Sequence, residues 1–432
     1  GFCCSIAAQT RKINVYNSGY ALFSQSTAML DSIKFSADGI ATFIYGTTTL
    51  YSRSTSVIDS LTFTNNSGTG DDVDTTDVNT EQGIYITWVN STVQVTNQYS
   101  SQGVTITTSG QHVTVNSTTS LSDLVYHLAG TSTNGSLTIN SVQPLILYPT
   151  DLTLTNPSGA AIAMLSNQDV VLHLPEGSTT TLADGTASSM KGAIQFKNKL
   201  TIQGTGTLNV TGNAKHGIQS GAKTTILSGV VNVTSNAKDG LNVDKFDMQG
   251  GTLTVQSVGD GIDGDEGYVK ISGGTIKVTC TGDDVKGIAA DSIIAISGGN
   301  TTVSVSGQQS KAIKTKQDFT LTDGVLAITA SGSYYSEASG SGYDLSYCSG
   351  IKANGSATIA GGTIQITCTS TNLGGRCIAS DGNLNILGGH LELKALGASG
   401  QYTNTEGAYD NYSSTCLKTD AGLYISGGTI VA

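Results

Sequence analysis

Apolar and polar residues alternate through most of this chain, in short segments that end at a pair of glycines. In Thr275–Cys280, for example, Ile276, Val278 and Cys280 alternate with Thr and Lys. Alternation with a period of two predicts half-buried β-strands rather than helices. The six residues ISGGTI occur at 271–276 and again at 425–430, with near-copies between them. Each Gly pair therefore predicts a tight corner between two short strands.

The glycine pairs recur with a regular period. They stand at 250–251, 273–274, 298–299, 361–362, 388–389 and 427–428, and Asp323-Gly324 fills the gap in the series. The basic period is about 25 residues, and two intervals are longer. A fixed period of this size is the signature of a solenoid. We predict an all-β protein whose residues 85–432 form a right-handed parallel β-helix that is truncated at its C-terminal end.

The residues before the repeats have a different pattern. Residues 11–65 are a tandem duplication, in which Asp31-Ser32-Ile33 matches Asp59-Ser60-Leu61, and they predict a module of duplicated β-hairpins. Residues 66–84 are polar and acidic and predict a linker. Residues 1–10, GFCCSIAAQT, suggest the remnant of a signal peptide, with a short buried strand as the alternative. We therefore expect a secreted or cell-surface protein of bacterial type.

Composition and charge exclude several classes of partner. Acidic residues number 32 against 21 basic ones, which gives a net charge of −11 and offers no basic stripe for nucleic acid. No stretch of about 20 apolar residues predicts a membrane span. The Cys and His residues lack the spacing of a zinc site. Cys377 and Cys416 fall in one inward column, and we expect unbonded stacked thiols there rather than a disulfide.

Acidic residues gather where the first regular coils place a short G-I-x-x-D strand. Carboxylates that repeat about 4.8 Å apart repel each other unless a cation lies among them. A set of oxygen ligands suits calcium, and the alternative is a solvated acidic face with Asp-Gly turns. The predicted calcium ligands are Asp239, Asn242, Asp244, Asp260, Asp263, Asp265, Asp283, Asp284 and Asp291.

In the later coils the same outward positions carry lysine. Lys314, Lys352 and Lys418, with Arg376 nearby, predict a basic end that binds a linear anionic polymer; the alternative is a role in solubility only. The two enlarged intervals, 331–350 and 397–416, are rich in tyrosine. We expect them side by side next to the lysines, where tyrosines contact sugar rings or else pack onto the solenoid. The predicted sugar contacts are Tyr334, Tyr335, Tyr343, Tyr402 and Tyr409.

From about residue 103 onward, the chain resembles the bacterial carbohydrate-binding β-helix domain family. The resemblance lies in LPEGSTTTLADG (174–185), KDGLNVD (238–244), GDGIDGDEG (259–267) and the ISGGTI coils. It implies a fold like that of polysaccharide lyases, bound calcium, and binding of cellulose or acidic sugars. By resemblance, the leading calcium ligands are Asp239, Asp244, Asp260, Asp263 and Asp265. Residues 11–65 lie outside the resemblance and suggest an accessory module that contacts surface partners.

Three functions remain open from the sequence. The first is a secreted, non-catalytic, calcium-dependent protein that binds polysaccharide. The second is a calcium-dependent pectate lyase with Lys286 as its base, or Lys238 as a second choice, although carboxylates beside a lysine keep it protonated. The third is an adhesin stalk that calcium stiffens and that has no sugar site. We expect the first of these.

Overall fold

A computed structural model describes residues 11–17, 20–26, 32–36, 40–45, 48–54, 60–65, 83–369 and 374–432 of the chain. The predicted signal remnant at 1–10 and nearly all of the predicted linker lie outside the described residues. The chain divides into two compact units, Gly1–Val78 and Asn79–Ala432, and each is described by itself below. Among the described residues, no helix is long and apolar enough to cross a membrane.

In its described residues, the first unit has six strands in two antiparallel sheets. They are β1 (Arg11–Asn17), β2 (Tyr20–Ser26), β3 (Ser32–Phe35), β4 (Ile40–Tyr45), β5 (Thr48–Ser54) and β6 (Ser60–Asn65). Each copy of the duplication contributes a hairpin, β1–β2 in the first copy and β4–β5 in the second. The third strand of each copy pairs with the hairpin of the other copy, β3 with β4 and β6 with β1. The two copies are therefore interlinked rather than independent.

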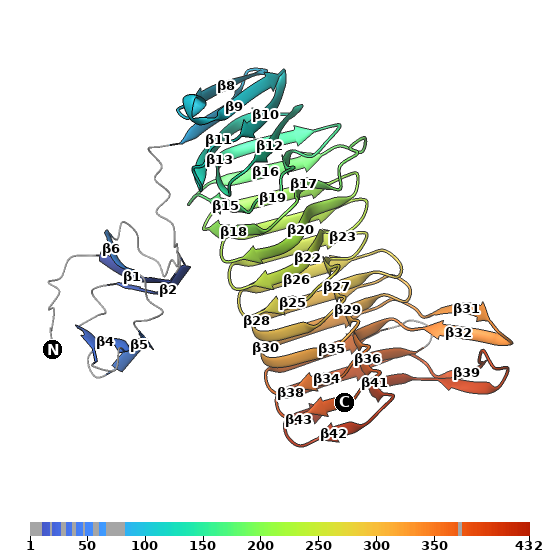
Figure 1. The fold of residues 1–432 in the computed structure, drawn as a ribbon. Coiled ribbons are helices and arrows are strands. Elements are labelled where there is room, and N and C mark those ends of the chain that lie inside the picture. Colours follow the sequence, from blue (N-terminus) through green and yellow to red (C-terminus); the bar gives the residue numbers. More distant parts are fainter. Residues whose placement is uncertain are drawn as a thin grey trace. The chain divides into compact units, whose positions relative to one another are not determined.

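The second unit is the predicted parallel β-helix, with about 11 turns of about 25 residues each (Figure 1). Its first part contains a single 3₁₀ turn, Ser100–Gln102. Strands of this part are β7 (Ile84–Val89), β8 (Thr92–Asn97), β9 (Val104–Ser109), β10 (Gln111–Ser117), β11 (Leu124–Ser132), β12 (Gly135–Ser141), β13 (Leu145–Asn156), β14 (Ile162–Met164), β15 (Val170–Leu174), β16 (Thr179–Asp184), β17 (Gly192–Phe196), β18 (Leu200–Gly204), β19 (Thr207–Gly212), β20 (His216–Ile226), β21 (Val230–Ser235), β22 (Leu241–Met248) and β23 (Thr252–Ser257).

The later coils extend to the last residues of the chain. Their strands are β24 (Ile262–Gly264), β25 (Val269–Ile271), β26 (Thr275–Cys280), β27 (Lys286–Ala290), β28 (Ile294–Val305), β29 (Lys311–Thr315), β30 (Phe319–Ala330), β31 (Tyr335–Ser339), β32 (Gly342–Ser346), β33 (Ser349–Ala353), β34 (Ala357–Ile359), β35 (Thr363–Cys368), β36 (Gly375–Ser380), β37 (Leu384–Ile386), β38 (His390–Ala395), β39 (Gly400–Thr403), β40 (Tyr409–Tyr412), β41 (Ser414–Thr419), β42 (Leu423–Ile425) and β43 (Thr429–Val431).

The apolar half of the alternation forms the core of the solenoid. Strands of successive coils pair in parallel, so that each inward residue stacks on its equivalent in the next coil. Met248 pairs with Ile271 and Ile271 with Ile296, as the repeat predicts, and all three side chains are buried. The polar half of each strand faces outward and forms columns along the solenoid. The structure therefore confirms both the fold and the register that the periodicity of the sequence predicts.

The second glycine of each Gly pair turns the corner with a positive φ angle and lies against the preceding coil. Gly274 has φ +78°, and a Cβ atom there would lie 2.8 Å from the Gly251 carbonyl oxygen. Any residue larger than glycine at position 274 would therefore have two unfavourable effects. It would adopt a left-handed backbone conformation, and its Cβ atom would clash with backbone atoms that cannot move aside.

We expect Gly274→Ala to lower the free energy of unfolding by about 3 kcal/mol, because strain and overpacking add. Gly177→Ala is the matched control: Gly177 has φ +70°, yet a Cβ atom there would have nothing within 4 Å. The control is expected to cost only about 1 kcal/mol. Thermal unfolding followed by circular dichroism compares the two variants, and equal losses would show that contact between coils contributes nothing.

The cysteines of the solenoid form no disulfide within the described residues. Cys280, Cys348, Cys368, Cys377 and Cys416 are free thiols, and the first four are buried. The register places Cys377 beside Cys416 in neighbouring coils, because Arg376 pairs with Thr415 and Ile378 with Leu417. The predicted stack of unbonded thiols is confirmed. Their role in this structure is to fill the core.

Candidate functional site

Two outward columns carry the charged residues of the later coils. The first column, here called the ladder column, contains the residue that directly follows the inward Ile or Leu of each short strand. Its members pair in register from coil to coil: Asn242, Asp263, Ala289, Lys314, Lys352, Ala379 and Lys418. The column changes from acidic to basic along the solenoid, as the sequence indicates. The prediction missed that alanine interrupts it twice.

The second column, here called the inner column, lies three residues earlier on each strand. Lys286 pairs with Lys311, Lys311 with Ser349, and Ser349 with Arg376. Backbone hydrogen bonds extend the column upstream to Asp260 and Asp239, through Gly261 and Gly240. Long cations therefore follow two carboxylates on adjacent coils.

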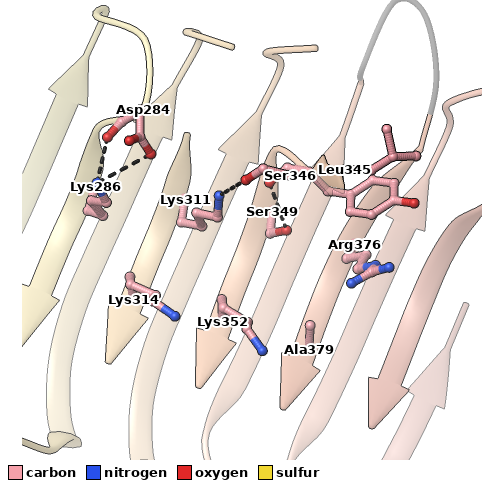
Figure 2. A pocket seen from close by; sticks show the side chains of 11 residues that line it. Asp284, Lys286, Lys311, Lys314, Leu345, Ser346, Ser349, Lys352, Arg376 and Ala379 are labelled. Atoms are coloured by element: carbon pink, nitrogen blue, oxygen red, sulfur yellow. Dashed lines mark hydrogen bonds and ion pairs between the residues drawn. The ribbon is translucent and has the colours of Figure 1, made fainter. Parts of the chain in front are cut away.

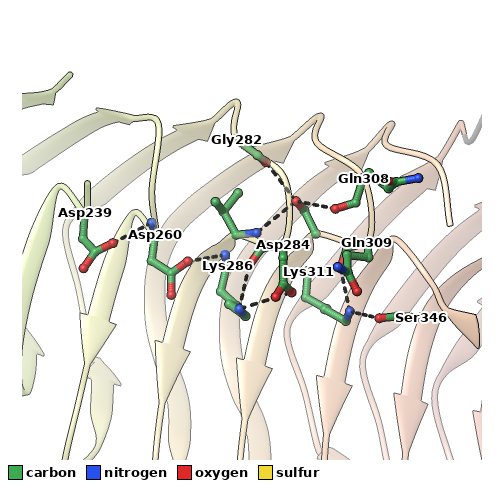
Figure 3. Close-up of polar contacts among 11 residues, drawn as sticks. Asp239, Asp260, Gly282, Asp284, Lys286, Gln308, Gln309, Lys311 and Ser346 are labelled. Carbon is green, nitrogen blue, oxygen red and sulfur yellow. Dashed lines mark hydrogen bonds and ion pairs between the residues drawn. The ribbon is translucent and has the colours of Figure 1, made fainter. Parts of the chain in front are cut away.

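Asp239 and Asp260 each bind the backbone of the next coil. The Asp260 amide donates to Asp239 Oδ1 at 2.9 Å, and the Lys286 amide donates to Asp260 Oδ1 at 2.7 Å (Figure 3). The other oxygen of Asp239 lies 3.0 Å from His216 Nδ1. These carboxylates thus hold successive coils in register, which is a structural role that the sequence did not reveal.

Burial, together with repulsion between carboxylates, raises the pKa values of three aspartates in the acidic coils. Burial, followed by the charges of Asp260 and other carboxylates, raises the pKa of Asp263 to about 7. Burial also raises the pKa of Asp260 to about 6, against the hydrogen bond from Lys286. The pKa of Asp244 is raised by burial and by Asp265. Near neutral pH, several carboxylates here thus share an environment that disfavours their charge.

The remaining predicted calcium ligands have other partners. Asp283 Oδ1 accepts a hydrogen bond from the backbone N–H of Gln308 at 2.7 Å, and Asp291 Oδ2 accepts one from Lys316 Nζ at 2.6 Å. Asp284 pairs with Lys286 at 3.4 Å. Across the described ranges, no three His, Cys, Asp or Glu side chains converge closely enough to hold a metal ion. The oxygen chemistry and the mutual repulsion at Asp263 fit calcium, whereas the arrangement of the side chains is too open for a complete cage of ligands.

Basic side chains of both columns surround a pocket of about 300 Å³, here called the anion pocket (Figure 2). It lies on strands β27, β29, β33 and β36, and the end of β32 with the following Tyr347 forms one wall. Lys311 and Lys286 take part in it, although the sequence did not single them out as sugar contacts. Its lining is Asp284, Lys286, Lys311, Lys314, Leu345, Ser346, Tyr347, Ser349, Lys352, Arg376 and Ala379.

The cations of the anion pocket are held by oxygen atoms and by an aromatic ring. Lys311 Nζ donates to the Gln309 carbonyl and, at 2.9 Å, to Ser346 Oγ. The Arg376 guanidinium lies 4.0 Å from the centre of the Tyr347 ring, a cation–π contact. Arg376 is the sole arginine between positions 83 and 432. Tyr347 is buried, and neither its position nor its spacing in the sequence predicted this contact.

Burial, with a smaller effect of neighbouring positive charge, lowers the pKa of two lysines of the anion pocket. Burial lowers the pKa of Lys311 to about 8, and Lys286 and Lys314 act in the same direction against Asp284. Burial lowers the pKa of Lys314, and the charge of Lys352 adds to the effect. Both lysines therefore stand in surroundings that disfavour their charge.

The tyrosine insertions form two hairpins that lie side by side at the C-terminal end of the solenoid (Figure 1). They are β31–β32 and β39–β40, and a parallel bridge joins Tyr343 to Asn404. Tyr334 stacks on Tyr412 with ring centroids 5.9 Å apart, and Tyr402 lies 6.4 Å from the same ring. The Tyr334–Tyr412 stack connects the two hairpins, whereas Tyr402 and Tyr412 belong to the same hairpin. The sequence did not predict either contact.

The other predicted tyrosines face solvent. Tyr335 is 38% exposed, Tyr343 is 49% exposed and Tyr409 is 87% exposed. Lys418 pairs with Asp420 and does not line the anion pocket. The structure thus brings Lys314, Lys352 and Arg376 together in one site. The exposed tyrosines lie on the two hairpins, and the first hairpin, β31–β32, continues into the wall of the pocket.

Comparisons with known proteins identify a family for most of the solenoid. The profile of a family described as carbohydrate-binding domain-containing protein matches residues 100–394, well over half of the chain. A solved structure of a polysaccharide lyase-like protein from C. thermocellum, a gadolinium derivative, is similar with 18% identity and a TM-score of 0.40. That similarity covers 71% of this chain and 97% of the other. Curated protein sequences gave no match. The chain belongs to the carbohydrate-binding domain family.

Proposed function

We propose that this protein is a secreted or surface-bound module that binds acidic polysaccharide without cleaving it. One observation carries the proposal: five cationic side chains surround a single pocket in a chain whose net charge is −11. Such a local reversal of charge concentrates anions at the pocket. The family supports a sugar as the ligand, and the charge of the pocket supports an acidic one.

The site offers two kinds of contact to such a polymer. The Arg376 guanidinium presents a planar fork that suits the two oxygens of a carboxylate, while Lys314 and Lys352 supply point charges. Exposed tyrosines on the neighbouring hairpins offer flat apolar faces rimmed by hydroxyl groups, which suit the faces of sugar rings. The polymer would lie along the solenoid, because the cations repeat from coil to coil in that direction.

We propose calcium as a second element of binding, at the acidic part of the ladder column. Asp263 and the second carboxylate oxygen of the neighbouring Asp260 would hold it, with polymer carboxylates and water completing the ligand set. The raised pKa of Asp263 supports this, because a cation would relieve the repulsion among these side chains. When bound, calcium would bridge anionic sugars to an anionic surface.

A non-catalytic role is favoured over the lyase alternative by the surroundings of Lys286. Its Nζ donates to the Asp284 carbonyl oxygen at 2.6 Å and lies 3.4 Å from Asp284 Oδ1. Both contacts hold the Lys286 amine against oxygens of its own coil, whereas a base that abstracts a sugar proton needs an amine free to reach the substrate.

Titration with polygalacturonate separates the alternatives. Binding would be measured by calorimetry with calcium and then with a chelator, while ultraviolet absorbance reports unsaturated products of cleavage. We expect binding that weakens with the chelator, and no product. Product formation that Lys286→Ala abolishes would make the protein a lyase. If polygalacturonate and a neutral glucan both fail to bind, the stalk alternative is correct.

Tyr409→Ala is expected to weaken polygalacturonate binding by roughly threefold to tenfold, because one stacked ring contributes about 1 kcal/mol. At 87% exposure, the ring contributes little to the packed hairpins, so the melting temperature should stay unchanged. Tyr424→Ala is the control, since Tyr424 is also exposed, at 57%, but lies on β42 away from the hairpins. Equal affinities of the wild type and Tyr409→Ala would assign the hairpins no role in sugar binding.

A further inference from the structure

Pairing of the charges leaves the anion pocket with three uncompensated cations. Lys286 pairs with Asp284, and Lys352 pairs with Asp381. Within the part of the chain that the structure describes, no ion pair joins a carboxylate to Lys311, Lys314 or Arg376. A ligand with one negative charge could form a direct ion pair with only some of these three cations.

Short residues between the long cations make room for a compact anion. Along the inner column, Ser349 stands between Lys311 and Arg376; along the ladder column, Ala379 follows Lys352. Two coil spacings separate Lys311 from Arg376, roughly 10 Å between their backbones. Ser349 and Ala379 both line the pocket. The cations therefore surround a recess with a small floor rather than form a continuous strip.

The donors around this recess are fixed before a ligand arrives. Ser346 and the Gln309 carbonyl hold Lys311 Nζ, the Tyr347 ring holds Arg376, and Lys314 donates to Asn354. Donors that are already oriented lose little side-chain entropy on binding. A group that presents several oxygens in different directions can use all of them, which a planar carboxylate cannot do.

We propose that the anion pocket binds a phosphate monoester carried on a sugar, in its dianionic form, in preference to the single carboxylate of a uronate. The three unpaired cations, the small recess between the columns and the fixed donors together support this ligand class. This inference rests on the proposed function, the binding of acidic carbohydrate at this site, and adds that the acidic group of the ligand is a phosphate. The apolar side chains of Leu345 and Tyr347 would face the sugar.

The experiment compares three ligands built on one sugar scaffold. Calorimetry at pH 7.5 would measure glucose 6-phosphate, glucose 6-sulfate and glucuronate, which carry two, one and one negative charges. We expect glucose 6-phosphate to bind at least tenfold more tightly than the other two. Lys311→Met should reduce that preference at least fivefold, with an unchanged circular dichroism spectrum and melting temperature as the check on folding.

The pH dependence of binding gives an independent signature. Affinity for glucose 6-phosphate should rise severalfold between pH 5.5 and 7.5, because the second ionisation of a phosphate monoester has a pKa of about 6. It should fall above pH 8, where unliganded Lys311 loses its proton. Glucose 6-sulfate, which stays a monoanion, should lack the rise, and it controls for titration of the protein itself. The charged or titratable groups that face Lys311 are Asp284, Lys286, Lys314, Cys348, Lys352 and Arg376.

Each contrary result has a distinct meaning. Equal affinities for the three glucose derivatives would overturn the preference for a dianion. Inorganic phosphate that binds as tightly as glucose 6-phosphate would overturn the role of the sugar. Digalacturonate that binds more tightly than glucose 6-phosphate would assign the pocket to two carboxylates instead. Those three results leave the proposed function standing, whereas failure of every one of these ligands and of polygalacturonate would overturn both proposals.

Discussion

Replacing Asp263 by asparagine is expected to stabilise the protein at pH 8 by at most about 4 kcal/mol, the equivalent of raising a pKa from 3.8 to about 7. Between pH 4 and 7 the folded protein binds a proton at Asp263 that the unfolded chain has released. The free energy of unfolding of the wild type therefore falls as the pH rises through this window, and the cost is complete above pH 7. Asparagine at position 263 carries no charge, so it avoids this loss of stability, and its side chain has the same shape as that of aspartate.

Thermal unfolding at pH 5 and pH 8, in the presence of a chelator, tests this expectation. The melting temperature of Asp263→Asn should exceed that of the wild type by several degrees at pH 8 and by much less at pH 5. Asp323→Asn, which changes an exposed carboxylate on β30, should alter neither value. A variant less stable than the wild type at pH 8 would show that the Asp263 charge is compensated.

The same pair of proteins tests the proposed calcium site. Calcium should raise the melting temperature of the wild type at pH 8, because a ligand that binds only the folded state stabilises it by mass action. Asp263→Asn should lose most of that gain, since it removes the most strained carboxylate of the set. A wild-type melting temperature that calcium leaves unchanged would remove calcium from the proposal and leave the anion pocket unaffected.

The fold could be predicted well from the sequence because every coil of a solenoid repeats the same pattern of strands and corners. Alternation assigns the strands, and the glycine pairs set the corners; the period then places Ile271 over Met248 without further information. The duplication at 11–65 predicted hairpins in the same way. It could not predict that β3 and β6 pair with the opposite copy, since both copies have the same pattern and therefore the same local preferences.

The candidate site was only partly predictable, for a geometric reason. Register along the solenoid placed Lys314 and Lys352 together, because that distance depends on the period alone. The pocket depends equally on Tyr347, which comes from an insertion whose path no repeat specifies. Similarly, the sequence marked Asp239 and Asp260 as acidic, but not that their oxygens accept backbone N–H groups from the next coil. Contacts between coils at non-repeating positions require the structure.

Arg376→Met is expected to weaken binding of acidic oligosaccharides about 30-fold, equivalent to about 2 kcal/mol for one charge-assisted hydrogen-bonding group. Arg376 is unpaired with any described carboxylate, so its charge is available to a ligand, and the Tyr347 ring keeps its guanidinium in place at 4.0 Å. Methionine retains much of the side-chain volume and its contact with the ring. Calorimetry with tetragalacturonate would measure the loss.

Two further variants separate the shape of this group from its charge. Arg376→Lys keeps the charge but replaces the planar fork with a single ammonium, so it should recover only part of the lost affinity. Lys199→Met removes a surface charge that pairs with Asp169 on an early coil and should leave binding unchanged. If Arg376→Lys binds as tightly as the wild type, the pocket recognises charge alone. If Lys199→Met weakens binding as much as Arg376→Met, attraction is a property of the whole surface, and the anion pocket is not the site.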